Sequence, residues 1–227
     1  PKHSGIGELM AFDAGGATTD VYSIADGSPE AGTILKGLEL PRVSRTVEGD
    51  IGLRYSADGI VESVGLEAVA ARAGLTAGEA AEGLERIRED KERKPGTPVE
   101  WALDRALAAW ALRIASGRHA GRIERTYTPM GETWVQSGKD LRRVRQLVFT
   151  GGALIHAPDP RGLLPDVLWR DDEALTLRPG AVDTLWLDRC YLLSALGLLA
   201  DDCPDQAFEL MYQELEAISV SAGGNAD

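Results

Sequence analysis

The chain has 227 residues, 44% of them hydrophobic and 26% charged, a composition typical of a soluble globular protein that can bury a sizeable core. A formal net charge of −12 excludes a duplex nucleic-acid binder, because no basic surplus is available to neutralise phosphates. There is no signal peptide or membrane-spanning stretch, and Cys190 and Cys203 form no metal-binding pattern. We therefore expect a cytoplasmic protein with reduced cysteines, one of them in the core, and no membrane partner.

The first predicted element is a β-hairpin over residues 8–25. Residues 9–12 form an apolar run typical of a buried strand, and alternating residues from Val21 predict a returning strand. Gly15 and Gly16 lie between them, where a tight turn is required.

The turn also carries chemistry. Consecutive backbone N–H groups can form a concave anion site, threonine hydroxyls add donors, and two carboxylates can hold a hydrated Mg²⁺. The residues that supply these groups are Asp13, Gly15, Gly16, Ala17, Thr18, Thr19 and Asp20. An ordinary hairpin with a Gly-Gly turn is the alternative, but the acids and threonines that bracket the turn favour a phosphate site.

This stretch resembles the second phosphate-binding hairpin of the actin, hexokinase and Hsp70 ATPase superfamily, whose pattern is Asp-x-Gly-Gly-small-Thr-x-Asp-aliphatic. The resemblance implies ATP and Mg²⁺ as cofactors. Asp13 would bind Mg²⁺ or the attacking water, and Asp20 would hold the metal through water. Thr18 would contact the γ-phosphate, which makes Asp13 and Thr18 the candidate catalytic residues. The N–H groups of residues 15–17 would hold the β- and γ-phosphates, with Thr19 nearby.

A third strand over residues 33–40 would complete an antiparallel meander. The sequence Glu48-Gly49-Asp50 then lies at a strand-to-helix junction. In the superfamily a Gly-acid pair at this place faces the nucleotide, so the resemblance adds these three residues to the predicted site. Acids favoured by the dipole of a helix N-terminus are the alternative, and the motif alone does not decide between them.

Two longer segments resemble a narrower family. Residues 45–54, Arg-Thr-Val-Glu-Gly-Asp-Ile-Gly-Leu-Arg, and residues 187–199, Leu-Asp-Arg-x-Tyr-x-Leu-x-Ala-x-Gly-Leu-Leu, are similar to the MutL (GlmL) family. Its members are accessory proteins of adenosylcobalamin-dependent glutamate (methylaspartate) mutase, unrelated to the DNA-mismatch-repair protein of the same name. The resemblance implies the subunits of such a mutase as partners.

The middle of the chain predicts helices followed by a hairpin. Residues 65–94 are expected to be helical, with Thr76 and Glu79 as a capping box, and residues 99–116 form the strongest helix, ended by Gly117. His119, just after it, fits a structural role better than contact with a ligand. Residues 122–138 predict a hairpin.

An apolar run at residues 146–150 predicts another buried strand of the core, and Gly151 and Gly152 follow it directly. Glycines there allow a nucleotide to approach the backbone, and the resemblance identifies the pair as the adenosine motif. A short helix over residues 162–169, a last strand at 174–177 and a mostly buried helix over 188–200 should follow. A closing helix would start at Pro204, and residues 219–227 should be disordered, with 221–227 as the tail.

Together these features predict an α/β, ribonuclease H-like actin-type ATPase domain, with a mixed five-stranded sheet and helices on both faces. Residues 1–60 and 140–220 would form the nucleotide-binding core and residues 61–139 an inserted, mainly helical subdomain. The chain starts without Met and has no first phosphate hairpin, so we interpret it as the C-terminal lobe of a longer ATPase, inactive alone.

In that interpretation the whole protein is a reactivating chaperone that exchanges damaged cobalamin on the mutase. A metabolite kinase of the same superfamily and a nucleotide-independent scaffold are the alternatives. The kinase would require a catalytic carboxylate beside an acceptor pocket, which the sequence does not identify.

Overall fold

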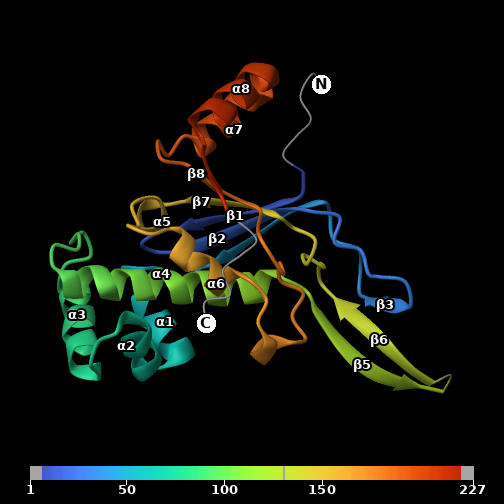
Figure 1. The fold of residues 1–227 in the computed structure, drawn as a ribbon, viewed down its shortest axis with the longest axis horizontal. Coiled ribbons are helices and arrows are strands. Elements are labelled where there is room, and N and C mark those ends of the chain that lie inside the picture. Colours follow the sequence, from blue (N-terminus) through green and yellow to red (C-terminus); the bar gives the residue numbers. More distant parts are fainter. Residues whose placement is uncertain (1–6, 130, 221–227) are drawn as a thin grey trace.

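A six-stranded mixed sheet forms the centre of the protein, in a computed structural model that describes residues 7–129 and 131–220. The strand order is β4-β2-β1-β7-β8-β9 (Figure 1). Strands β1, β7 and β8 run parallel, and the others join antiparallel. The strands are β1 (Leu9–Ala14), β2 (Thr19–Ile24), β4 (Val43–Glu48), β7 (Gln146–Thr150), β8 (Thr184–Leu187) and β9 (Glu216–Ser219).

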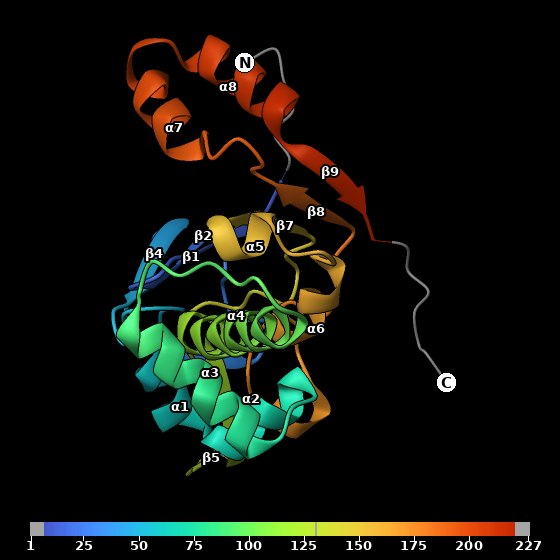
Figure 2. The ribbon, with the colours of Figure 1, turned by 90° about the vertical axis from the view of Figure 1, so that its left-hand side faces the viewer.

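The main core lies between this sheet and a long helix, α4 (Pro98–His119) (Figure 2). Alternate residues of the central strands are fully buried, as the two-residue period of a strand requires. Phe12 and Phe149, on neighbouring strands, pack edge to face with ring centroids 6.1 Å apart. Aromatic packing thus adds to the backbone pairing of β1 with β7.

Three further helices pack beneath α4: α1 (Ala57–Val64), α2 (Leu66–Ala73) and α3 (Ala77–Glu89). Thr76 and Glu79 form the predicted capping box of α3, and Thr97 and Glu100 form a second one at α4. Short segments α5 (Gly152–Ile155), η1 (Arg161–Leu163), α6 (Leu164–Val167) and η2 (Asp171–Glu173) follow β7.

The other face of the sheet is partly covered by α7 (Leu193–Asp202) and α8 (Pro204–Glu214). Leu193 and Met211 from these helices pack on a small cluster built around Val148, Trp186 and Leu215. Helices on both faces of a mixed α/β sheet are therefore confirmed. No helix in the described ranges combines the length and hydropathy needed to cross a membrane.

A second sheet of three strands, ordered β3-β6-β5, extends from the main body (Figure 1). It contains β3 (Thr33–Lys36), β5 (Arg122–Thr128) and β6 (Gly131–Ser137). The predicted hairpin over residues 122–138 is confirmed. The predicted meander is wrong in its third strand, because β3 pairs with β6, while β4 takes the place beside β2.

The predicted end of the sheet also needs correction. Residues 174–177 are not the last core strand, because their backbone bonds to residues 121, 123 and 141, and Thr176 makes an isolated bridge to Arg122. The strand beside β7 is β8, and β9 brings the total to six, not five. Ser219, expected in a disordered tail, ends β9, and residues 221–227 lie outside the described residues.

Two helix predictions differ from the structure in their ends. Gly117 lies inside α4, which continues to His119 with Ala120 as its C-cap. The helix predicted from residue 188 begins at Leu193, and none of its residues is buried, because its apolar residues pack only partly, against α8 and the edge of the sheet. No core cysteine exists either, since Cys190 is exposed and Cys203 half-buried, both free.

A buried polar cluster joins the end of α4 to the sheet. The His119 ring nitrogens lie 2.8 Å from the Ser23 hydroxyl and 2.9 Å from the Thr46 hydroxyl. Lys139, also buried, donates to the Arg42 carbonyl at 2.7 Å. Burial, and then the charge of Lys139, lowers the pKa of His119 to about 4. The predicted structural role of His119 agrees with these contacts.

This cluster should make stability depend on pH. An unfolded histidine binds a proton near pH 6.5, and folded His119 only near pH 4, so the unfolded state holds more protons between these values. The free energy of unfolding should therefore fall as pH drops, by about 2 kcal/mol between pH 7 and pH 5. Urea denaturation should show a smaller loss in His119→Gln, whereas the exposed-site control His156→Gln should keep the wild-type slope. Identical slopes in all three proteins would contradict the assignment.

Candidate nucleotide site

The carboxyl ends of three parallel strands meet at one edge of the main sheet. Asp13 near the end of β1 lies opposite Thr150 at the end of β7. Asp188, directly after β8, donates its backbone N–H to the Phe149 carbonyl at 3.0 Å. Ligands of open α/β sheets bind outside such carboxyl ends. The edge therefore brings together parts of the predicted site that are far apart in the sequence.

The β1–β2 turn leaves several backbone N–H groups without a partner in the described part of the chain. Gly15 donates its N–H to the Thr18 carbonyl at 2.9 Å, which closes the turn. Among the described residues, no backbone or side-chain acceptor meets the N–H groups of Gly16, Ala17 and Thr18. Three successive donors are thus left for water or for a phosphate group.

The segment after β4 holds this turn in place. Leu53 donates its N–H to the Gly15 carbonyl, and Arg54 and Tyr55 both donate theirs to the Gly16 carbonyl at 2.8 Å. Gly52 allows this approach, since a Cβ there would lie 2.4 Å from the Ala17 carbonyl carbon. The Gly-Leu-Arg part of the family-like motif therefore has a definite task, which is to fix the turn by backbone contacts.

The two acids of the predicted metal site lie in different surroundings. Asp20 is engaged on both oxygens, by Arg45 at 2.6 and 2.9 Å and by the Thr18 hydroxyl at 3.1 Å. Asp13 is half-buried, and the Tyr191 hydroxyl lies 3.5 Å from each of its carboxylate oxygens, a long and weak contact. Burial, and next the charge of Asp20, raises the pKa of Asp13. Asp13 is thus the acid with oxygens open to a new ligand.

The donor set at this edge fits Mg²⁺ only if other ligands join it. No group of three or more His, Cys, Asp or Glu side chains within the described ranges is arranged to hold a metal ion. Mg²⁺ commonly binds one or two carboxylates and completes its shell with water and substrate phosphates. Asp13 beside the free N–H groups of the turn suits that mode of binding.

Glu48 and Asp50 both form ion pairs with the same side chain, Arg118. Arg118 of α4 contacts Glu48 at 2.7 Å and both Asp50 oxygens at 2.7 and 2.9 Å. This ion pairing lowers the pKa of Asp50. Neither acid lies in a first helical turn, because α1 starts only at Ala57. Glu48 pairs with Thr19 across the strands, so the cluster adjoins the turn, and its contact with nucleotide stays a prediction.

The glycine pair after β7 packs directly against Asp13. Gly151 has φ +89°, and a Cβ there would lie 2.7 Å from the Asp13 Oδ1 and 2.6 Å from the Ala14 carbonyl oxygen. Gly152 starts α5 and has open space around the position of a Cβ. Gly151 is therefore required by the close approach of two strand ends, whereas Gly152 leaves its surroundings open for a ligand.

A hollow of about 210 Å³ lies between α4 and the segment that follows the glycine pair. Its lining includes Trp101 and Asp104 of α4 and Ala153, the neighbour of Gly152. Asp104 also pairs with Arg54 at 2.5 Å, and Arg54 is bonded to the turn through its backbone. The hollow is thereby connected to both glycine-containing segments of the predicted site.

Asp188 and Tyr191 were not among the predicted site residues. Asp188 is buried and accepts hydrogen bonds from the Thr150 hydroxyl at 3.0 Å and from the N–H groups of Leu192 and Leu193. It fixes a loop in which Tyr191 adopts φ +56°, an uncommon conformation for a residue other than glycine, beside Asp13. The family-like sequence at residues 187–199 was the available signal, but it was interpreted as a buried helix.

Comparison with known proteins agrees with the family-like segments. A family model described as "MutL protein" matches residues 1–215. A curated relative, "Protein MutL" from Clostridium tetanomorphum, is 40% identical over 215 residues. The alignment covers 94% of this chain and 46% of the relative, so the chain spans less than half the length of that protein.

The two adjacent glycines offer a matched test of the strand-end packing. Gly151→Ala should lower the free energy of unfolding by at least ~2 kcal/mol, because the new Cβ would meet Asp13 and Ala14 at a positive φ. Gly152→Ala should change it by less than ~1 kcal/mol, since its site is open. Urea denaturation of both variants measures the difference. Equal losses would show that β1 and β7 are not packed as described.

Proposed function

The chain belongs to the MutL family, and from this premise we propose that it forms the nucleotide-binding lobe of an accessory protein for a cobalamin-dependent glutamate mutase. In this proposal the fold is an actin-type ATPase domain and the ligand is Mg²⁺-ATP. The observation that carries it is the β1–β2 turn, where three successive N–H groups without an acceptor among the described residues adjoin the carboxylate of Asp13.

Each part of the site has a separate task in this proposal. The N–H groups of residues 16–18 bind the terminal phosphates, whose negative charge they match. Asp13 holds the metal or orients water, and Thr18 lies at the same turn with its hydroxyl on Asp20. Bound Mg²⁺ would neutralise phosphate charge. The hollow beside Trp101 and Ala153 supports a place for the base, because it adjoins Gly152.

Arg45 explains why two acids can lie beside a phosphate site. Its guanidinium pairs with Asp20, so the turn presents one free negative charge and not two. A phosphate group therefore meets less repulsion, and Asp13 alone remains for a cation. This arrangement favours nucleotide with its metal over free nucleotide.

The family and the connections of the turn support the proposed role toward the mutase. Arg54 links the turn to Asp104 of α4, so a change in phosphate occupancy would act on that helix. Such a two-state response is how nucleotides move other proteins of this general design. We propose that the motion serves the exchange of damaged cobalamin on the mutase subunits.

Nucleotide binding can be tested at the turn. Asp13→Ala and Thr18→Ala should each weaken Mg²⁺-ATP binding by roughly 10- to 150-fold in isothermal titration calorimetry, the equivalent of ~1.5–3 kcal/mol. Asp202→Ala, at an exposed acid of α7, is the control and should bind as the wild type does.

A metal-free titration separates the two roles of Asp13. In EDTA, Asp13→Ala should bind ATP as well as the wild type or better, since the carboxylate then only repels the phosphates. If both Asp13→Ala and Thr18→Ala bound Mg²⁺-ATP with wild-type affinity, the turn would be an ordinary hairpin without a role in nucleotide binding.

Turnover should distinguish this chain from a longer relative. Phosphoryl transfer depends on groups placed around the whole phosphate chain, and in our proposal the described residues 7–129 and 131–220 contribute one hairpin, the β1–β2 turn, to holding the phosphates. We expect Mg²⁺-ATP to bind but little phosphate to be released in a malachite-green assay. The Clostridium tetanomorphum relative, about twice as long, should release it readily. Similar turnover by both proteins would show that one lobe suffices.

A further inference from the structure

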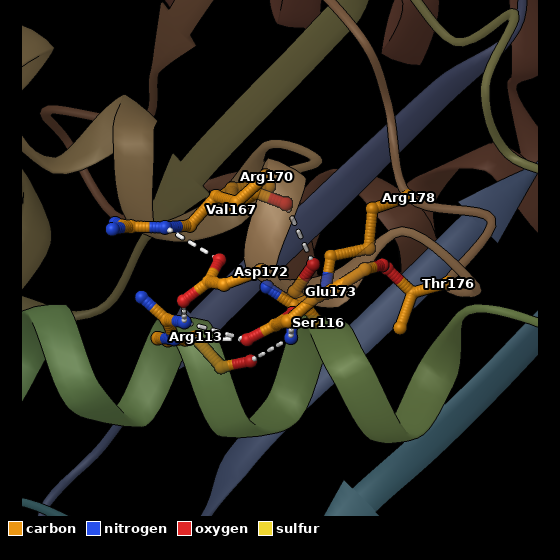
Figure 3. A network of polar contacts seen from close by, with 8 residues as sticks. All are labelled: Arg113, Ser116, Val167, Arg170, Asp172, Glu173, Thr176 and Arg178. Atoms are coloured by element: carbon orange, nitrogen blue, oxygen red, sulfur yellow. Dashed lines mark hydrogen bonds and ion pairs between the residues drawn. The ribbon is translucent and has the colours of Figure 1, made fainter.

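A second cavity, of about 500 Å³, lies along the carboxyl-terminal half of α4. One wall comes from α4 itself, and another from residues 172–178, which fold back onto the helix (Figure 3). None of the glycines of the proposed nucleotide site lines it. The cavity is therefore apart from the glycine-containing segments, and it adjoins the predicted site only through Arg118, which pairs with Glu48 and Asp50.

The lining of this cavity is positively charged. Four arginines, Arg113, Arg118, Arg122 and Arg178, contribute to it, against two acids, Asp172 and Glu173. Arg118 is matched by Glu48 and Asp50, which leaves three arginines for the two acids. Asp172 is additionally shared with Arg170. The chain as a whole has a net charge of −12, so a cavity lined by four arginines differs from its average surface.

Arg178 is the unusual member of the set. Its side chain is only 4% exposed, and its Nη2 donates to the Arg113 carbonyl and lies 2.8 Å from Glu173. Its Nε and Nη1 groups are buried without any hydrogen-bond partner in the described part of the chain, and Oε2 of Glu173, although within ion-pair distance of Nη2, also has no hydrogen bond there. A buried guanidinium with unmet donors is costly, and this cost lowers the pKa of Arg178.

One carboxylate cannot satisfy the surrounding cations. Glu173 pairs with Arg178 through one oxygen and with Arg113, at 2.7 Å, through the other, as Figure 3 shows. Arg113 also takes Asp172 at 3.1 Å, but that acid is 61% exposed and its attraction is weakened by water. The two acids match Arg113 and Arg178 in number, but the exposed Asp172, which also pairs with Arg170, offsets its share of the positive charge only weakly.

Arg122 adds an exposed cation to the same cavity. It starts β5, beside the backbone bridge to Thr176, and its side chain has no ion-pair partner among the residues that the structure describes. The cavity therefore combines an exposed, unpaired arginine with a buried one whose donors are unmet.

We propose that this cavity binds a small oxyanion, carried either by free phosphate or by a small carboxylate. Arginine is the side chain best suited to both groups, because its planar fork donates to two oxygens at once. Arg122 contacts the anion at the exposed side, and Arg178, with Arg113, attracts it from the buried side. Binding supplies the negative charge that Glu173 alone cannot provide.

Calorimetric titration with inorganic phosphate, and separately with succinate, tests the proposal at low ionic strength. We expect saturable binding of at least one probe, weakened at least about tenfold in Arg122→Gln and in Arg178→Met. Arg143→Gln, at an exposed arginine outside the cavity, should bind as the wild type does. The probe that binds identifies phosphate or carboxylate as the source of the oxyanion.

A second readout keeps the test independent of folding and of the nucleotide site. If Arg178→Met does not fold, Arg122→Gln decides, since that side chain is exposed and has no ion pair with any described residue. Titration of wild type should also shift the Nε–H resonance of Arg178 in ¹H–¹⁵N spectra, and Arg122→Gln should leave Mg²⁺-ATP affinity unchanged. Binding of neither probe, or wild-type binding by Arg122→Gln with an unshifted Arg178 resonance, would overturn the proposal.

Discussion

Strands β1 and β7 lie side by side although the helical layer and the second hairpin separate them in the sequence. Their parallel pairing buries Phe12 against Phe149 and places Asp13 opposite Thr150. Because Gly151 follows at once, its backbone can touch Asp13 and Ala14 without a side chain between them. The β1–β2 turn, the glycine pair and Asp188 are neighbours only because this one pairing exists.

Helix α4 carries the second set of constraints. Near its start Asp104 holds Arg54 and through it the β1–β2 turn, and near its end Arg118 and His119 hold β4 and β2. The helix therefore contacts the site at two places and packs its apolar face on the sheet between them. Together with the pairing of β2 and β4, which places Glu48 opposite Thr19, these contacts keep Glu48 and Asp50 close to the turn.

Local patterns predicted the features that depend on nearby residues. The hairpin around Gly15, the capping box at Thr76, the long helix and the strand before Gly151 all follow from periodicity and turn chemistry within a short window. The partner of β2 did not, because residues 33–40 and 43–48 both alternate and only tertiary pairing chooses between them.

The candidate site divides in the same way. Residues 13–20 and the glycine pair can be recognised in the sequence as glycines, threonines and acids at predicted turns. Tyr191 cannot, because it reaches Asp13 through a positive φ that no sequence pattern requires. Similarly, the burial of Arg178 under one shared carboxylate is a product of how residues 172–178 fold back on α4.

The β1–β7 pairing also has a consequence for how the chain acquires its structure. During synthesis β1 emerges long before β7, by several seconds or more at roughly 5–20 residues per second. In that interval the hairpin has formed its local bonds, but Met10 and Phe12 still lack the neighbours that bury them. Loop closure over so long a segment makes the contact slow as well as late. Nascent chains of this protein are thus exposed to aggregation at one apolar strand until its distant partner arrives.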